Sequence, residues 1–168
     1  MILDKKYSSW ILGALILLLI SFFYLLIFPH PIADDLAFGN QAKTTDFFTQ
    51  LQSTYINWNG RYSGNFFIQL FPISIENLVF YRVLLLVSFS LFIISFYTFI
   101  KSVFIKTDAI KLWSITLLGV LAYLSILPTL AEGFYWYTSV IYYQLSLIFL
   151  LFFSALVINF INQQFLFH

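Results

Sequence analysis

The fold class follows from residues 10–28, which read WILGALILLLISFFYLLIF. This stretch contains no charged side chain. As a helix it extends about 28 Å at 1.5 Å per residue, which matches the hydrocarbon core of a bilayer. The run is longer than the apolar region of a cleaved signal peptide, so we expect a retained membrane span. Pro29 and Pro31 follow directly and end the helix.

The composition of the whole chain also indicates a membrane protein. Of its 168 residues, 61% are hydrophobic and 9% are charged, whereas a soluble domain carries about 25% charged residues. So little charge cannot cover a surface that faces water. Further apolar runs predict spans at about 79–100, 112–127 and 139–161. The sequence therefore predicts an all-α fold, a polytopic bundle of four transmembrane helices that forms one domain over residues 1–168.

The distribution of lysine and arginine predicts how these spans are oriented. Basic residues collect in the short loops on the cytoplasmic side of a membrane. One side carries five of them, namely Lys5, Lys6, Lys101, Lys106 and Lys111, and the other carries Lys43, Arg61 and Arg82. We therefore expect both termini in the cytoplasm, and the segments 29–78 and 128–138 outside it.

The long outer segment is expected to contain an amphipathic helix at about 46–58, on the surface of the outer leaflet. Thr45 is the expected cap, with Asp46 in the first turn. The apolar side would comprise Phe47, Phe48, Leu51, Tyr55 and Trp58, and the polar side Thr49, Gln50, Gln52, Ser53 and Asn57. Further along, Ser74 is the expected cap of the second span, with Glu76 in its first turn.

Two adjacent carboxylates, Asp34 and Asp35, follow the first span. The negative charges of two adjacent carboxylates repel each other, so the pair needs solvent, a cation or a base nearby. One acid can serve as a general base while the other binds a divalent metal such as Mg²⁺ or Mn²⁺, or both can bind the metal. The alternative is that both are solvated loop acids.

Arg61, Glu132, Trp58 and Trp136 are the candidate binding residues in the outer segments. Arg61 can hold a phosphate through two hydrogen bonds, or it can pair with an acid or a lipid headgroup. Glu132 can join the acids, and Trp136 with its neighbouring tyrosines can stack on a sugar ring. The alternative for these two is a solvated acid in an interfacial aromatic belt. The net charge of +1 gives no reason to expect a nucleic-acid partner.

The order of these motifs resembles the N-terminal part of GT-C-type membrane glycosyltransferases, and more narrowly an uncharacterised bacterial family of that superfamily. The matching parts are Ala33-Asp34-Asp35, Trp58-x-Gly60-Arg61 and Trp136 with its tyrosines, over roughly residues 1–145. The resemblance implies a catalytic acid at Asp34 or Asp35, with Arg61 and Glu132 in support. It also implies a polyprenyl-phosphate sugar donor, an extracytoplasmic acceptor and a bacterial inner membrane.

Such enzymes have more spans than the four predicted here. The chain is therefore expected either to be the N-terminal part of a longer protein or to have lost the remaining spans. The tail after residue 161 has no basic stop signal, which favours the first alternative. A competing hypothesis is a non-enzymatic four-helix membrane protein, such as a flippase component for lipid-linked sugars or an assembly partner of other membrane subunits.

Overall fold

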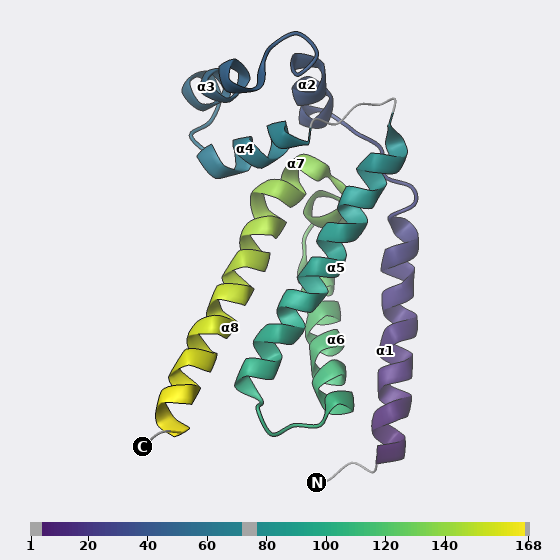
Figure 1. Cartoon of the computed structure of the whole chain (residues 1–168). Coiled ribbons are helices and arrows are strands. Elements are labelled where there is room, and N and C mark those ends of the chain that lie inside the picture. Colours follow the sequence, from purple (N-terminus) through teal and green to yellow (C-terminus); the bar gives the residue numbers. More distant parts are fainter. Residues whose placement is uncertain (1–4, 72–76, 167–168) are drawn as a thin grey trace. The chain divides into compact units, whose positions relative to one another are not determined.

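The computed structural model describes residues 5–71 and 77–166, and within these residues it contains helices and no strand. Four helical segments are long and apolar enough to cross a membrane, namely Tyr7–Leu25, Leu78–Val103, Ala109–Ile126 and Tyr137–Gln163. They confirm the predicted all-α, multi-pass membrane fold (Figure 1). The predicted orientation of the termini stays a prediction.

Short helices connect the first long helix to the second and the third to the fourth, whereas the second and third long helices follow each other directly. Their bounds are α1 Lys5–Leu25, α2 Asp34–Gln41, α3 Phe47–Asn57, α4 Tyr62–Leu70, α5 Leu78–Val103, α6 Ala109–Ile126, α7 Tyr137–Ser139 and α8 Leu145–Leu166. Two π-helical segments, η1 Ala131–Tyr135 and η2 Val140–Gln144, flank α7. The chain divides into two compact units.

The first span ends at Leu25, before the predicted end at Phe28. The cause is Pro29, whose ring would clash with the carbonyl of Leu25 if the helix continued, and which has no N–H to bond to it. The fourth apolar segment begins at Tyr137, slightly before the predicted residue 139.

The membrane-spanning unit consists of α1, the part of α5 from Phe89 onward, α6 and α8. Within it α1 packs along α6, and Phe92 and Val120 are fully buried. Its buried hydroxyl groups bond back to their own helices: Ser95 donates to the Phe92 carbonyl and Thr116 to the Leu112 carbonyl, both over 2.8 Å. These side chains are therefore satisfied without water, as hydrocarbon surroundings require.

The second unit comprises residues 26–88 and 129–144, with the short helices α2, α3, α4 and α7. Here α3 packs against α4, while α4 contacts η2 and α2 contacts α7. The cap of α3 is Asp46, whose side chain accepts from the Thr49 N–H at 3.1 Å, and not Thr45 as the sequence suggested. Ser74 and Glu76 lie outside the described residues, and α5 is instead capped by Asn77, which accepts from the Phe80 N–H at 3.1 Å.

The predicted amphipathic helix is present as α3, but its buried side differs from the prediction. Gln50 and Thr54 are buried together with Leu51, whereas Phe48 is 77% exposed. The reason is polar packing: the Gln50 amide donates to the Phe38 carbonyl at 3.3 Å, and Thr54 Oγ1 accepts from the Gln69 amide at 3.1 Å. Assigning Gln50 to the water-facing side was therefore wrong, because its hydrogen bonds within the unit make burial possible.

Candidate functional site

A polar pocket of about 320 Å³ lies within the second unit. Three separate chain segments supply its lining: the start of α2, the turn between α3 and α4, and the stretch that contains α7 and η2. The lining residues are Asp34, Trp58, Asn59, Arg61, Trp136, Thr138, Ser139, Tyr142 and Tyr143. The volume falls in the range of small-molecule sites, and we call it the polar pocket below.

Asp34 is the carboxylate of the polar pocket. It opens α2, where the helix dipole favours a negative charge. Its side chain is half-buried and accepts no hydrogen bond from any residue in 5–71 or 77–166. The preceding residue, Ala33, has φ 44° and ψ −112°, a conformation that strains any residue with a Cβ. Asp34 is thus a fixed carboxylate with free acceptor capacity.

Asp35 has a different environment, although it is the next residue along the chain. It is 1% exposed. Its Oδ1 accepts from the Thr138 N–H at 2.9 Å and from the Thr138 hydroxyl at 2.5 Å, and its Oδ2 accepts from the Tyr81 hydroxyl at 3.1 Å. Burial raises the pKa of Asp35 above its ordinary value, and the bonds from Thr138 and Tyr81 oppose that shift. These bonds connect α2 to α7, whose residue Thr138 also lines the polar pocket.

The turn that carries Arg61 is held by amide side chains. Asn59 Oδ1 accepts from the Arg61 N–H at 3.1 Å, and the Asn65 amide donates to the Asn59 carbonyl at 3.3 Å. The Tyr142 hydroxyl then donates to Asn65 Oδ1 at 2.7 Å. An added Cβ at Gly64 would run into the Tyr142 ring, so glycine permits this close approach. The turn between α3 and α4 is therefore fixed to η2.

The guanidinium of Arg61 lies over aromatic rings. Its Cζ is 4.7 Å from the centre of the Tyr142 ring and 5.2 Å from that of Tyr143. It also donates to the Tyr143 hydroxyl at 3.1 Å. Within the described parts of the chain no carboxylate lies at ion-pair distance from it. Cation–π contacts leave the edge donors of a guanidinium largely available, so Arg61 can still bind an anion.

Both predicted tryptophans line the polar pocket. Trp58 is 63% exposed and lies 6.1 Å from the Phe38 ring, measured between ring centres. Trp136 has a buried indole nitrogen that finds no hydrogen-bond acceptor in the described residues. An unsatisfied buried donor at the wall of a pocket is a position where a ligand oxygen would be stabilised.

The predicted relationship of Glu132 with the two aspartates is absent from the geometry. Glu132 is exposed on η1 and accepts from the Thr129 hydroxyl at 2.9 Å, and it is not among the described residues that line the polar pocket. Arg82 donates from Nε to the Pro29 carbonyl at 3.3 Å, so it bonds to the end of the first connection. Glu132 therefore does not join the two aspartates.

The residues do not fit a divalent cation shared by Asp34 and Asp35. Both carboxylate oxygens of Asp35 already accept hydrogen bonds, and the side chain is buried. No third acid or histidine completes a metal-binding group within the described residues. Hard cations such as Mg²⁺ need several free oxygen ligands, which this pair of aspartates does not offer.

Sequence reasoning missed the part of the site that comes from α7 and η2. Thr138 was predicted only as part of the outer segment 128–138, and Tyr142 and Tyr143 only as part of the fourth span, although the fourth apolar segment contains all three. Thr138 lies in α7. Tyr142 and Tyr143 lie in the π-helical η2, and such wide turns are frequent at functional sites. The only signal in the sequence was the concentration of tyrosine at 135, 137, 142 and 143, which an aromatic belt explains equally well.

Comparison of the chain with protein-family models, curated proteins and solved structures finds no match.

Proposed function

We propose that this membrane protein is a GT-C-like glycosyltransferase, or the N-terminal part of one, that transfers a sugar from a polyprenyl-phosphate donor to an extracytoplasmic acceptor. One observation supports the proposal above others. Asp34 and Arg61, a carboxylate and a cation that are not paired with each other, line the same pocket together with two tryptophans. Sugar transfer from a phosphate donor needs a base, an anion-binding group and apolar ring faces in one place.

Each of these groups has a defined role in the proposed reaction. Asp34 takes the proton of an acceptor hydroxyl, whose oxygen attacks the anomeric carbon of the donor sugar. The bond between that carbon and the phosphate oxygen breaks, and the polyprenyl phosphate leaves with the electron pair. Arg61 stabilises the negative charge that develops on the leaving phosphate. Trp58 and Trp136 offer ring surfaces to the apolar faces of the sugar.

Asp35 is a positioning residue in this scheme. It is 1% exposed and its carboxylate already accepts three hydrogen bonds from Thr138 and Tyr81, so a substrate hydroxyl has little access to it. By holding Thr138, it keeps α2 and the α7 segment at a fixed separation on the two sides of the pocket.

The proposal includes an orientation. With both termini in the cytoplasm of a bacterial cell, the polar pocket opens on the outer side of the inner membrane. A donor whose lipid lies in the bilayer would reach it there, with membrane lipid as its surroundings and other membrane subunits as potential partners. The lysine distribution supports this orientation.

The test is Asp34→Asn, which keeps the size of the side chain and removes its basicity. Loss of a general base typically lowers turnover by about 10²–10⁴. The assay is transfer of a labelled sugar from polyprenyl-phosphate sugar in membranes, with the protein level measured in the same samples.

Asp46→Asn is the matched control, since asparagine caps a helix as well as aspartate does and Asp46 lies outside the polar pocket. Full transfer by Asp34→Asn would contradict the role of Asp34. Absence of transfer by the wild-type protein would favour the non-enzymatic alternative, a flippase component or assembly partner.

A further inference from the structure

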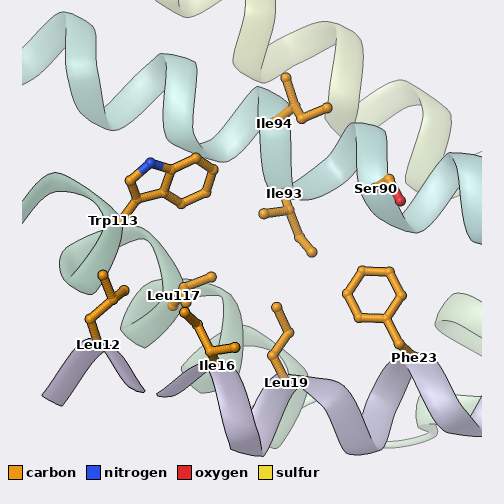
Figure 2. Close-up of a pocket in the computed structure, with 9 residues that line it drawn as sticks. All are labelled: Leu12, Ile16, Leu19, Phe23, Ser90, Ile93, Ile94, Trp113 and Leu117. Atoms are coloured by element: carbon orange, nitrogen blue, oxygen red, sulfur yellow. The ribbon is translucent and has the colours of Figure 1, made fainter. Parts of the chain in front are cut away.

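The second unit contains another pocket, of about 100 Å³, which we call the amide pocket. Its lining comes from α2, with Ala37, Phe38 and Gln41, and from the end of α3, with Ser53, Thr54, Asn57 and Trp58. The membrane-spanning unit has instead an apolar groove, lined mainly by hydrocarbon side chains of α1, α5 and α6 (Figure 2). A hydrophilic ligand is therefore suited to the amide pocket and not to the groove.

The amide pocket combines carboxamides, hydroxyl groups and aromatic rings, and none of its lining residues is charged. The polar pocket differs in this respect, because Asp34 and Arg61 line it. An ion in the amide pocket would lose hydration without gaining an opposite charge. A neutral molecule rich in hydroxyl groups finds donors and acceptors on the two carboxamides and ring faces on Phe38 and Trp58. A neutral sugar ring has both of these features.

The two carboxamides of the amide pocket keep hydrogen-bonding capacity for a ligand. Asn57 donates to the Ser53 hydroxyl over 3.4 Å, and Gln41 Oε1 accepts from the Gln50 amide over 3.5 Å. Both bonds are longer than the usual range of about 2.7–3.2 Å. Within residues 5–71 and 77–166, the Asn57 carbonyl oxygen accepts no bond and the Gln41 amide group donates none. Sugar hydroxyls can therefore replace the water that fills a polar space of this kind.

The size of the amide pocket fits a single ring. About 10–15 Å³ of such space holds one water, so the pocket has room for about seven to ten. That is enough for one sugar ring with its hydroxyl groups and too little for two. The pocket is also preformed: the Gln50 amide donates to the Phe38 carbonyl at 3.3 Å, and the rings of Phe38 and Trp58 lie 6.1 Å apart. These two contacts hold α2 beside α3.

The amide pocket adjoins the polar pocket. Trp58 lines both of them. On α2, Asp34 and the amide-pocket residues recur at three- and four-residue spacing, so they share one face of the helix. Ala37 and Phe38 lie only about 4.5–6 Å further along the helix axis than Asp34. A hydroxyl on the near edge of a sugar in the amide pocket can therefore reach the Asp34 carboxylate.

We propose that the amide pocket binds one neutral sugar residue. The assignment of this residue to the acceptor, whose hydroxyl it presents to Asp34, rests on the proposed sugar transfer, whereas the binding of the sugar does not. The acceptor is then a saccharide or glycoconjugate that ends in an uncharged sugar, and the product is a glycan extended by one residue.

The binding test is saturation-transfer NMR of the full chain in a detergent without a sugar headgroup. The probes are the methyl glycosides of glucose, galactose, mannose and N-acetylglucosamine, titrated one at a time, and we expect at least one to bind. Ala37→Phe inserts a ring from an exposed position on α2 and should weaken this binding at least about tenfold. Asn57→Ala removes an exposed hydrogen-bonding group and should weaken it about two- to tenfold.

Each variant has a control on the same helix. Asn40→Phe on α2 and Gln52→Ala on α3 change exposed residues that line neither pocket, so both should bind the glycoside as the wild type does. Asn57→Ala adds no bulk and therefore keeps the proposal testable if Ala37→Phe unfolds. No binding of any glycoside by the wild type, or equal binding by Asn57→Ala and Gln52→Ala, would overturn the proposal.

Transfer to the bound glycoside separates this proposal from the proposed function. With that glycoside as acceptor, Ala37→Phe should raise the acceptor KM at least about tenfold and leave the donor KM within about twofold. Binding that Ala37→Phe abolishes, without transfer by the wild type, would contradict the transfer and support the sugar site. Transfer with an unchanged acceptor KM in Ala37→Phe would contradict the sugar site and support the transfer.

Discussion

Replacing Asp35 by alanine should destabilise the protein strongly, whereas replacing it by asparagine should not. The difference follows from the donors that surround its carboxylate. In Asp35→Ala the Thr138 N–H and hydroxyl both lose their acceptor. The Tyr81 hydroxyl keeps one, because the Tyr135 carbonyl also lies 3.1 Å from it. Two buried donors without an acceptor cost about 1–3 kcal/mol each, so the free energy of unfolding should fall by about 2–6 kcal/mol.

Asp35→Asn can satisfy every one of these groups. Its side-chain oxygen accepts from Thr138 as the carboxylate does. Its amide donates to the Tyr81 hydroxyl, whose own proton then goes to the Tyr135 carbonyl. The variant also removes the cost of burying a charge. We therefore expect a stability within about 1 kcal/mol of the wild type.

The pH dependence provides an independent check on the same residue. The folded state raises the pKa of Asp35, so the native protein holds this proton more tightly than the unfolded chain does. Its contribution to stability is therefore complete below the ordinary value of 3.8 and is lost as the pH rises through the folded pKa. Asp35→Asn should lack this decline.

The assay is thermal unfolding in detergent followed by circular dichroism, at several pH values, with Asp35→Ala and Asp35→Asn measured side by side. Equal and small effects of the two substitutions would refute the hydrogen-bond account of Asp35. If Asp35→Asn kept its stability and lost sugar transfer as completely as Asp34→Asn, the positioning role would be wrong and Asp35 would act on the substrate.

Three other outcomes are expected. In this cysteine-free chain, Thr49→Cys should react with an impermeant thiol reagent in intact cells and Lys106→Cys should not; the reverse would overturn the orientation. Gly64→Ala should lower the melting temperature, because forcing a methyl group against Tyr142 costs about 1–3 kcal/mol, more than the roughly 1 kcal/mol that alanine gains in a helix. Ala33→Gly should raise the melting temperature, because it relieves positive-φ strain worth about 1–3 kcal/mol. A lower melting temperature would show that this backbone is unstrained.

The spans were predictable because their signal is local. An uncharged apolar run long enough to cross a bilayer has few other solutions, and each of the four runs forms a helix. The predicted ends of the spans were less accurate. The apolar run continues to Phe28, but Pro29 ends the helix a full turn earlier, at Leu25.

The site was predictable only in part. The sequence drew attention to Asp34, Arg61, Trp58 and Trp136, and all four line the polar pocket. It could not separate Asp34 from Asp35, although consecutive residues on a helix point about 100° apart and only one of two neighbours can face a given pocket. Which neighbour is buried depends on Thr138, and no local pattern reveals a partner that distant.

The bond between Asp35 and Thr138 also sets a waiting time during biosynthesis. The two residues are 103 positions apart, and chains are synthesised at about 5–20 residues per second. For about 5–20 s after Asp35 is made, the ribosome has not yet added the residue that holds it. Throughout that interval two intervening spans must be inserted while the carboxylate is solvated or bound by another factor. Slowed translation between residues 36 and 138 would lengthen this exposure, and degradation of nascent chain should increase with it.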